Sequence, residues 1–257
     1  MSRPGDAIRL AVGTFSALPV PPPRTVDRRT AGIAVPLAPV AVLPVGVLVG
    51  AIAWVAVAID LPAIVVGALS IGAGALATRG FHLDGLADTA DALASSYDRE
   101  RALTVARTGD VGPAGAATLA LVLMLQVGAA GSVALLAWGP VAVGALWCLS
   151  RAAGTIGLSR GVPAAREDGL GATFAGSVGP VVLAAAWSTV AAASGVLAVL
   201  VDLSPVQGVG AVVAALVVVT MLVVHVVRRL GGIIGDAVGA SIEIALAVLL
   251  LGFAAVL

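Results

Sequence analysis

Long apolar stretches separated by short charged segments dominate the pattern along this chain. Five runs contain no charged residue, and they cover 30–59, 61–78, 111–150, 169–201 and 203–227. A helix of about 20 apolar residues spans the hydrocarbon core of a bilayer. The runs lack the alternating polarity of a membrane β-barrel, in which lipid-facing and lumen-facing positions take turns. The pattern therefore predicts an all-α, polytopic helical integral membrane protein with about six to seven transmembrane helices.

The apolar runs and the turn residues between them predict where the spans lie. The Trp138-Gly139-Pro140 sequence is a turn signal that divides the longest run into two spans. Pro36 and Pro39 predict that the first span is kinked or begins late. Residues 6–18 are expected to form a short amphipathic helix at the membrane interface, and residues 1–257 a single domain. The expected spans are about 33–58, 62–78, 115–137, 140–158, 179–201, 205–227 and 238–257.

The arginines predict which side of the membrane the loops face. In this layout all 14 basic residues, every one an arginine, lie on one side, and the opposite loops carry only Asp60 and Asp202. The positive-inside rule makes the arginine-rich side cytoplasmic. We therefore expect a bacterial inner-membrane protein whose N-terminus and active site face the cytoplasm. No cleavable signal is expected, because Arg3 and Arg9 precede a proline-rich segment rather than a short apolar core.

The composition narrows the possible partners. The residues are 60% hydrophobic and 11% charged, far from the quarter that is usual in soluble domains, so the lipid bilayer is the expected environment. A formal net charge of zero gives no reason to expect a nucleic-acid partner. The single cysteine, Cys148, excludes an intramolecular disulfide framework and lies in an apolar run, where a packed thiol is expected. The sequence does not define the oligomeric state, and a homo-oligomer is compatible with it.

The strongest chemical signal is an acidic stripe between the second and third spans. Asp84, Asp88 and Asp91 are spaced i, i+4 and i+7, which places them within an arc of about 60° on a helix. Carboxylates on one stripe repel one another unless they share a cation, and hard oxygen ligands suit Mg²⁺ or Mn²⁺ bridging to substrate phosphate. The alternative is a solvated acidic face. His82 is a candidate to orient a ligand, bind phosphate or act as a general base, or it is merely interfacial.

A second constellation lies at the start of the last span. Asp236 and Glu243 are again spaced i and i+7, so we expect both to face one interior cavity and to contribute metal ligands or position a nucleophile. A carboxylate inside a span is costly without a partner, which favours a functional role for Glu243. Gly232 and Gly235 permit close approach to a neighbouring helix or a phosphate. A helix N-cap and plain helix packing are the structural alternatives.

Arginines and glycines in the same loops are candidates to bind an anionic substrate. Arginine forks match phosphate geometry, and glycines let backbone amides approach it. Arg151 lies within a span, where snorkelling or pairing with an acid is the alternative. The candidate substrate-binding residues are Arg79, Arg107, Arg151, Arg166, Gly169, Gly171, Gly232 and Gly235.

These motifs resemble those of the cobalamin synthase family, the adenosylcobinamide-GDP ribazoletransferases. The segment Gly80-Phe-His-Leu-Asp-Gly-Leu-Ala-Asp-Thr-Ala-Asp91 is similar to the family hallmark. Segments 15–21, 166–174 and 231–243 resemble the family's other motifs in the same order. One departure lies before the third span, where many members have Lys-Asp-Ser-Arg: here Thr108 replaces the acid and Asp110 stands where arginine is common.

The resemblance implies a late step of cobalamin biosynthesis that requires Mg²⁺. A ribose hydroxyl of α-ribazole, or of its 5′-phosphate, attacks the cobinamide-bearing phosphorus of adenosylcobinamide-GDP and GMP leaves. Metal bound by the carboxylates neutralises the diphosphate, as in other phosphoryl transfers. Asp91 is the preferred candidate for the base that accepts the hydroxyl proton, and His82 is the other.

Two other classes fit parts of the pattern. A CDP-alcohol phosphatidyltransferase also uses spaced aspartates in a helical membrane domain, but the Ala-Arg continuation of its signature is absent after Asp84-Gly85. A secondary transporter with a proton relay predicts carboxylates near the middle of the spans, whereas here they cluster at the cytoplasmic ends.

Overall fold

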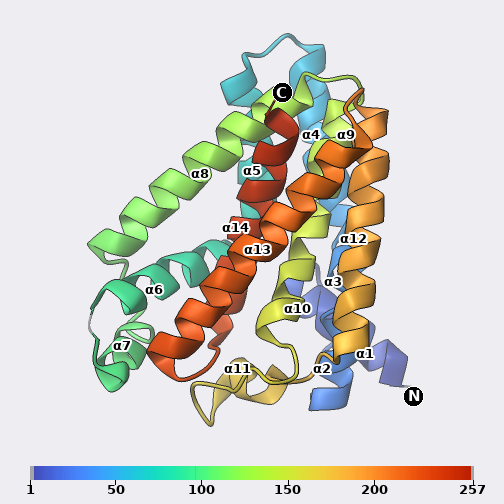
Figure 1. Cartoon of the computed structure of the whole chain (residues 1–257). Coiled ribbons are helices and arrows are strands. Elements are labelled where there is room, and N and C mark those ends of the chain that lie inside the picture. The colour runs from blue at the N-terminus through green and yellow to red at the C-terminus, as the bar shows by residue number, and fades with distance from the viewer. Residues whose placement is uncertain (1–2, 96, 256–257) are drawn as a thin grey trace.

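The computed structural model describes residues 3–95 and 97–255 as a helical bundle (Figure 1). Within these ranges there is no β-strand, and the only bridges are two isolated ones, Ser159 with Val178 and Ala164 with Ile233. The predicted all-α fold class is confirmed. The last two residues of the seventh predicted span, 256–257, lie outside the described residues.

The helices follow the apolar runs of the sequence. In chain order they are α1 (Arg3–Phe15), α2 (Arg28–Ala34), α3 (Ala38–Ala41), α4 (Leu43–Ala58), α5 (Ala63–Ala77), α6 (Phe81–Ser95), α7 (Arg99–Val105), α8 (Pro113–Ala134), α9 (Gly139–Leu149), the 3₁₀ turn η1 (Ser150–Ala153), α10 (Gly154–Gly157), α11 (Gly169–Phe174), α12 (Pro180–Leu200), α13 (Pro205–Leu230) and α14 (Gly235–Ala254).

Several of these helices are long and apolar enough to cross a bilayer, as a multi-pass membrane protein requires. By length and composition α8, α12, α13 and α14 qualify individually, and α5 with α6 qualifies as a pair bent by 92°. The described residues thus give four candidate spans, or five with the bent pair, fewer than the six to seven predicted; α4 is apolar but only 16 residues long. The first span is broken and begins late, as its prolines predict: α2 and α3 precede the long helix α4, so the expected start at residue 33 is too early.

Proline and left-handed residues set the helix boundaries. A proline occupies the first turn of α8, α9, α12 and α13, where its missing N–H costs no helical hydrogen bond. Trp138 at φ 54° begins α9 and confirms the predicted turn between the third and fourth spans. Asp60 and Asp202 adopt the same left-handed conformation in the turns after α4 and α12.

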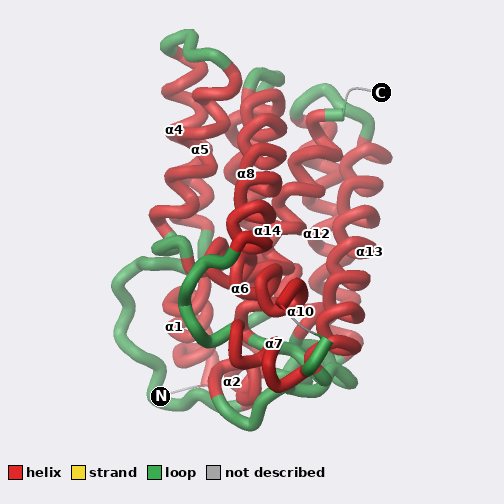
Figure 2. The backbone as a smooth tube through the Cα atoms, turned by 90° about the vertical axis from the view of Figure 1, so that its left-hand side faces the viewer, coloured by secondary structure: helices red, strands yellow, loops and turns green. Residues whose placement is uncertain are grey.

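The connections separate into two ends of the bundle. Figures 1 and 2 place the α4–α5, α8–α9 and α12–α13 turns together at one end. The opposite end carries α1, α2, α7 and α11, and with them the arginine-rich segments, as the sequence predicts. The amphipathic N-terminal helix is confirmed with slightly different bounds: α1 buries Ala7, Leu10, Ala11 and Phe15, while Ile8 is exposed.

Helix α14 forms the centre of the bundle. Two thirds of its apolar segment is buried within the protein, compared with about a third in α8, α12 and α13. It packs against α6, α8 and α13, whereas α4 with α9 and α5 with α8 form further pairs beside it. Residues on α14 are therefore shielded from lipid on most sides, which permits polar side chains at membrane depth.

Small residues allow these helices to approach closely. A Cβ atom at Gly67 of α5 would overlap the carbonyl oxygen of Val127 of α8, and one at Gly131 of α8 would overlap the carbonyl oxygen of Ala63 of α5. Because lipid tails are as apolar as the helix surfaces, close van der Waals packing of this kind drives helix association in membranes.

We predict that Gly131→Ala destabilises the protein and that Gly128→Ala on the same helix does not. The new methyl group at position 131 meets the backbone of α5, and overpacking of this kind typically costs about 1–3 kcal/mol. At position 128 nothing lies within 4 Å of an added Cβ. The measurement is the thermal midpoint at which detergent-solubilised protein loses its monodisperse elution peak. Equal midpoints for the two variants would contradict the α5–α8 contact.

Candidate active site

A tight turn between α5 and α6 directs the acidic stripe into the protein. Arg79 at φ 55° and Gly80 at φ 69° reverse the chain after α5, and the Thr78 hydroxyl donates to the carbonyls of Gly74 and Ala75 at 3.1 and 3.0 Å. The turn leaves α6 at 92° to α5, across the ends of its neighbours (Figure 1). Arg79 itself is exposed in this turn and does not line the cavities described below, which argues against its predicted role in substrate binding.

Two glycines bring α6 against the first turns of α14. A Cβ atom at Gly85 would lie 2.7 Å from the carbonyl oxygen of Asp236, and one at Gly239 would lie 3.2 Å from the Cα of His82. Only glycine fits such an approach without displacing a backbone. The contact places the acidic residues of α6 beside the acid that begins α14.

The acidic side chains enter the protein to different depths. Asp84 is exposed, Asp88 and Asp236 are half-buried, and Asp91 is buried. Asp88 faces the charges of Asp84, Asp236 and Asp91, and Asp236 also faces Asp84. Among the described residues, Asp84, Asp88 and Asp236 have no hydrogen bond or ion pair. The predicted helix carrying the stripe is therefore confirmed, and the alternative of a fully solvated acidic face is wrong.

Asp91 has a structural role that the spacing does not indicate. Its two carboxylate oxygens accept hydrogen bonds from the backbone amides of Gly112 and Gly115, at 2.7 and 2.8 Å. These amides belong to the first turn of α8, where helical N–H groups have no partner within the helix. A Cβ atom at Gly115 would lie 2.9 Å from the backbone carbonyl oxygen of Ala87, so a larger residue there would displace α8 from α6. Asp91 thus anchors the start of α8, which argues against its predicted roles as metal ligand and base.

The five predicted metal ligands do not converge on one point. In the part of the chain that the structure describes, no group of three or more His, Cys, Asp or Glu side chains is close enough to hold an ion. Asp84, Asp88 and Asp236 remain near one another with free oxygens, while Asp91 is engaged by α8 and Glu243 faces a separate cluster. A site with few protein ligands still suits Mg²⁺, which usually binds one or two carboxylates and completes its shell with water and substrate phosphate.

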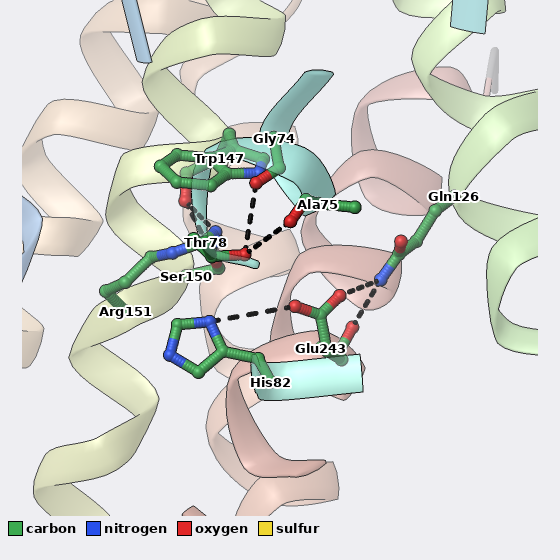
Figure 3. Close-up of polar contacts among 9 residues, drawn as sticks. All are labelled: Gly74, Ala75, Thr78, His82, Gln126, Trp147, Ser150, Arg151 and Glu243. Carbon is green, nitrogen blue, oxygen red and sulfur yellow. Dashed lines mark hydrogen bonds and ion pairs between the residues drawn. The ribbon is translucent and has the colours of Figure 1, made fainter. Parts of the chain in front are cut away.

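Glu243 belongs to a buried polar cluster between α6, α8 and α14 (Figure 3). Gln126 Nε2 donates to both the side chain and the carbonyl of Glu243, at 2.8 and 3.0 Å. His82 Nδ1 lies 4.0 Å from Glu243 Oε1. The expectation that Asp236 and Glu243 line one cavity is wrong, because they lie two helical turns apart and line different spaces.

Arg151 completes this cluster from the fourth span. Its guanidinium stacks over the Trp147 ring at 3.3 Å, donates to the Trp147 carbonyl and donates to Ser150 Oγ at 2.8 Å. It lines a cavity of about 10 Å³ together with Glu243, Gln126 and other residues, enough for about one water molecule. The side chain is 1% exposed, so the snorkelling alternative is wrong and its predicted contact with substrate is not supported.

A larger cavity lies on the other side of His82. It has a volume of about 250 Å³ between α1, α6, α14 and the segment before α12. Its lining includes four residues that the sequence predicts to bind substrate, together with the predicted metal ligand Asp236. The four are Arg166, Gly169, Gly171 and Gly235. Gly232 is not among them, because it packs against the backbone of Ala164.

The loop arginines are held by protein contacts rather than left free. Arg166 Nη2 donates to the carbonyl of Leu103 at 2.6 Å, while its buried Nε has no partner among the described residues. Burial, and then the charge of Arg107, lower the pKa of Arg166. Arg107 reaches both carboxylate oxygens of Asp168 at 2.7 and 2.8 Å, which joins the α7–α8 loop to the cavity-lining loop. Arg166 is therefore the predicted arginine best placed for a ligand.

Two residues that position the site were not predicted. Gln126 is a lone amide deep in an apolar span, and that isolation was the available signal. Arg99 donates to the carbonyls of Leu230 and Ala165, each at 2.7 Å, and so joins the end of α13 to the cavity-lining loop. No sequence spacing indicates the second contact, because its partners are backbone atoms far away in the chain.

We predict that Asp91→Ala destabilises the protein, whereas Asp88→Ala leaves stability close to that of the wild type. The first substitution leaves two amides of α8 without a carboxylate, and buried unsatisfied groups cost about 1–3 kcal/mol each. Thermal midpoints of the two purified variants measure the difference. A midpoint of Asp91→Ala equal to that of Asp88→Ala would refute the anchoring role.

We also predict that Arg151→Met and Glu243→Gln are each destabilising and that the double variant is less destabilised than their sum. The two charges face each other across the small cavity without a direct ion pair among the described residues, so removing one leaves the other less compensated, at a cost below the roughly 3–5 kcal/mol of a broken buried ion pair. Removing both charges relieves that penalty. A double-mutant cycle on thermal midpoints measures the coupling, and strict additivity would show that the two side chains do not interact.

Comparisons with known proteins show the family to which the chain belongs. The family model described as cobalamin-5-phosphate synthase matches residues 7–254. An adenosylcobinamide-GDP ribazoletransferase from Nocardioides sp. (strain ATCC BAA-499 / JS614) is 48% identical over 250 residues, covering 97% of this chain and 99% of that protein. The corresponding protein of Frankia casuarinae is 36% identical, covering 95% of this chain and 92% of its own. No solved structure matches. The chain belongs to the cobalamin-5-phosphate synthase family.

Proposed function

We propose that this protein is an adenosylcobinamide-GDP ribazoletransferase. A ribose hydroxyl oxygen of α-ribazole, or of its 5′-phosphate, forms a bond to the cobinamide-bearing phosphorus of adenosylcobinamide-GDP. The bond from that phosphorus to the GMP oxygen breaks, and the hydroxyl proton passes to a base. The similarity to proteins of this name over nearly the whole chain is the observation that carries the proposal. Membership of the family also argues against the phosphatidyltransferase and transporter alternatives.

One or two of the carboxylates of Asp84, Asp88 and Asp236 would hold Mg²⁺, with Mn²⁺ as a substitute, because among the described residues no three acids are close enough to bind one ion together. Their oxygens have no hydrogen bond or ion pair among the described residues, and their charges repel one another, so a cation bound there would relieve that repulsion. When bound, the ion would neutralise the diphosphate and the developing charge on the departing GMP oxygen. The remaining ligands would come from substrate phosphate and water.

The protein's own groups account for binding and orientation. Arg166, with its unpartnered Nε beside Asp236, would pair with a phosphate oxygen as arginines do in other phosphate sites. His82 lines the larger cavity and is the better placed of the two predicted proton acceptors, because Asp91 is engaged by α8. The first turn of α14 adds backbone amides that favour an anion.

The arginine-rich end of the bundle would face the cytoplasm of a bacterial cell. That end carries α1, α7, α11 and the acidic stripe, and the positive-inside rule orients it inward. The inner membrane is therefore the proposed location, with both water-soluble nucleotide portions delivered from the cytoplasm. A homo-oligomer remains a separate proposal, tested by the mass of the solubilised complex.

We predict Mg²⁺-dependent release of GMP from adenosylcobinamide-GDP and α-ribazole by the reconstituted protein. Asp84→Ala and Asp236→Ala should each lower the rate by about a hundredfold to a thousandfold, the usual cost of removing one charge-stabilising group. Asp60→Asn, in a turn at the opposite end of the bundle, is the matched control and should retain full activity. The readout is GMP together with a cobalamin product.

A folded wild-type protein that gives no product with either nucleoside acceptor would refute the transferase proposal. Turnover that persists in chelator-treated protein, with Asp84→Ala unchanged, would instead refute the metal-binding role while leaving the reaction standing.

A further inference from the structure

The larger cavity is predominantly apolar and aromatic. Phe15 and Phe174 line it and are almost fully buried, at 3% and 4% exposure, while Phe81 lines it and is 54% exposed. Leu158 and Ile242 supply aliphatic surface. The walls come from α1, α6, α11 and α14, so segments far apart in the sequence meet around one space.

The aromatic rings are arranged to receive another ring. The His82 ring lies 6.1 Å from both Phe15 and Phe81, tilted by 39° to the first and by 65° to the second. Tilted and edge-on arrangements at these distances are the favourable geometries between aromatic groups. A flat aromatic ligand entering beside them would find both ring faces and ring edges to pack against.

Three charged side chains form the polar part of the cavity lining: Arg166 and Asp168 from the loop before α11, and Asp236 from the start of α14. Asp168 is paired with Arg107, while Asp236 faces the charges of Arg166 and of Asp84 on α6. His82 does not extend this polar part through Nδ1, because that atom is buried and turned toward Glu243 (Figure 3). A ligand that matches this division has an apolar aromatic portion joined to a polar portion that lies at the acidic cluster.

We propose that this cavity binds the base of the acceptor nucleoside, the benzimidazole ring of α-ribazole, with its ribose at the Asp236 end. The inference rests on the proposed function and assigns one part of one substrate to one place. Benzimidazole has no exocyclic donor or acceptor and only one ring nitrogen that can accept a hydrogen bond, so an apolar wall can surround it while leaving far fewer polar atoms to be paired than guanine presents. The nucleoside's hydroxyls then lie beside the carboxylates at which phosphoryl transfer is proposed.

The other substrate portions fit this cavity less well. Guanine carries several donors and acceptors, and burying such groups in an apolar space without partners is unfavourable. A corrin macrocycle is too large, because a volume of about 250 Å³ is at the lower limit of small-molecule sites. The donor would therefore approach the acidic cluster from outside the cavity.

Steady-state kinetics of Phe81→Ala test the inference. Because Phe81 is largely exposed, its truncation should leave the fold intact. We expect the KM for α-ribazole to rise about five- to tenfold, as loss of one aromatic contact implies, with the KM for adenosylcobinamide-GDP unchanged. Phe81→Trp keeps an aromatic ring and should restore most of the affinity. Ala172→Phe, which fills the cavity from α11, should raise the same KM.

Trp138→Ala is the matched control, because Trp138 is an exposed aromatic residue in the turn at the other end of the bundle. It should leave both KM values unchanged. If the KM for α-ribazole is unchanged in both Phe81→Ala and Ala172→Phe, the inference about the cavity is wrong. The proposed function still stands in that case, because the wild-type protein and the variants turn over. A rise confined to the KM for adenosylcobinamide-GDP would overturn the inference too, by assigning the cavity to the donor. Absence of turnover in the wild type would instead refute the proposed function.

Discussion

The close approach of α6 to α14 is the contact on which the candidate site depends. Gly85 lies against the backbone of Asp236, and Gly239 lies against the backbone of His82. Any larger side chain at these positions would separate the helices, and the acids of α6 would move away from the acid of α14. The same contact forms one wall of the larger cavity and brings His82 to within 4.0 Å of Glu243. One pair of glycines therefore positions the acidic cluster, the cavity and the buried polar cluster together.

The three aspartates of the acidic stripe on α6 have different roles. Asp91 lies deepest and is used to hold the first turn of α8, where its charge is matched to free amides. Asp88 and Asp84, one and two turns earlier, reach the open side beside Asp236. The spacing alone predicted three equivalent metal ligands. Because α6 enters the protein along its length, residues on the same helix face lie in different surroundings, exposed at one end and buried at the other. The anchoring of α8 also fixes the helix that supplies Gln126 to the polar cluster.

Much of the fold could be predicted because bilayer thickness and backbone hydrogen bonding leave few choices for an apolar run. The helix through Asp84 and Asp88, the turn at Trp138 and the gathering of arginines at one end followed from the sequence. The surroundings of Arg151 could not be predicted from the sequence. Trp147, Ser150 and the nearby Glu243 stabilise its charge, and packing of the spans brings Glu243 to it. The separation of Glu243 from Asp236 was missed for a related reason: seven residues return to the same face of a helix but lie about 10 Å further along it.

Because Glu243 and Asp236 line different spaces, His82 lies between the larger cavity and the buried polar cluster. Its ring lines the larger cavity, yet its Nδ1 is turned toward Glu243, whose other oxygen accepts from Gln126. This Nδ1 has no hydrogen bond among the described residues, and at 4.0 Å Glu243 acts on it only as a nearby charge behind the cavity wall. Burial of the Glu243 and Arg151 charges is costly in a membrane interior and is tolerated only where the partners are close. The cluster thus lies directly behind a residue that lines the cavity, and its hydrogen bond from Gln126 to Glu243 joins α8 to α14 there.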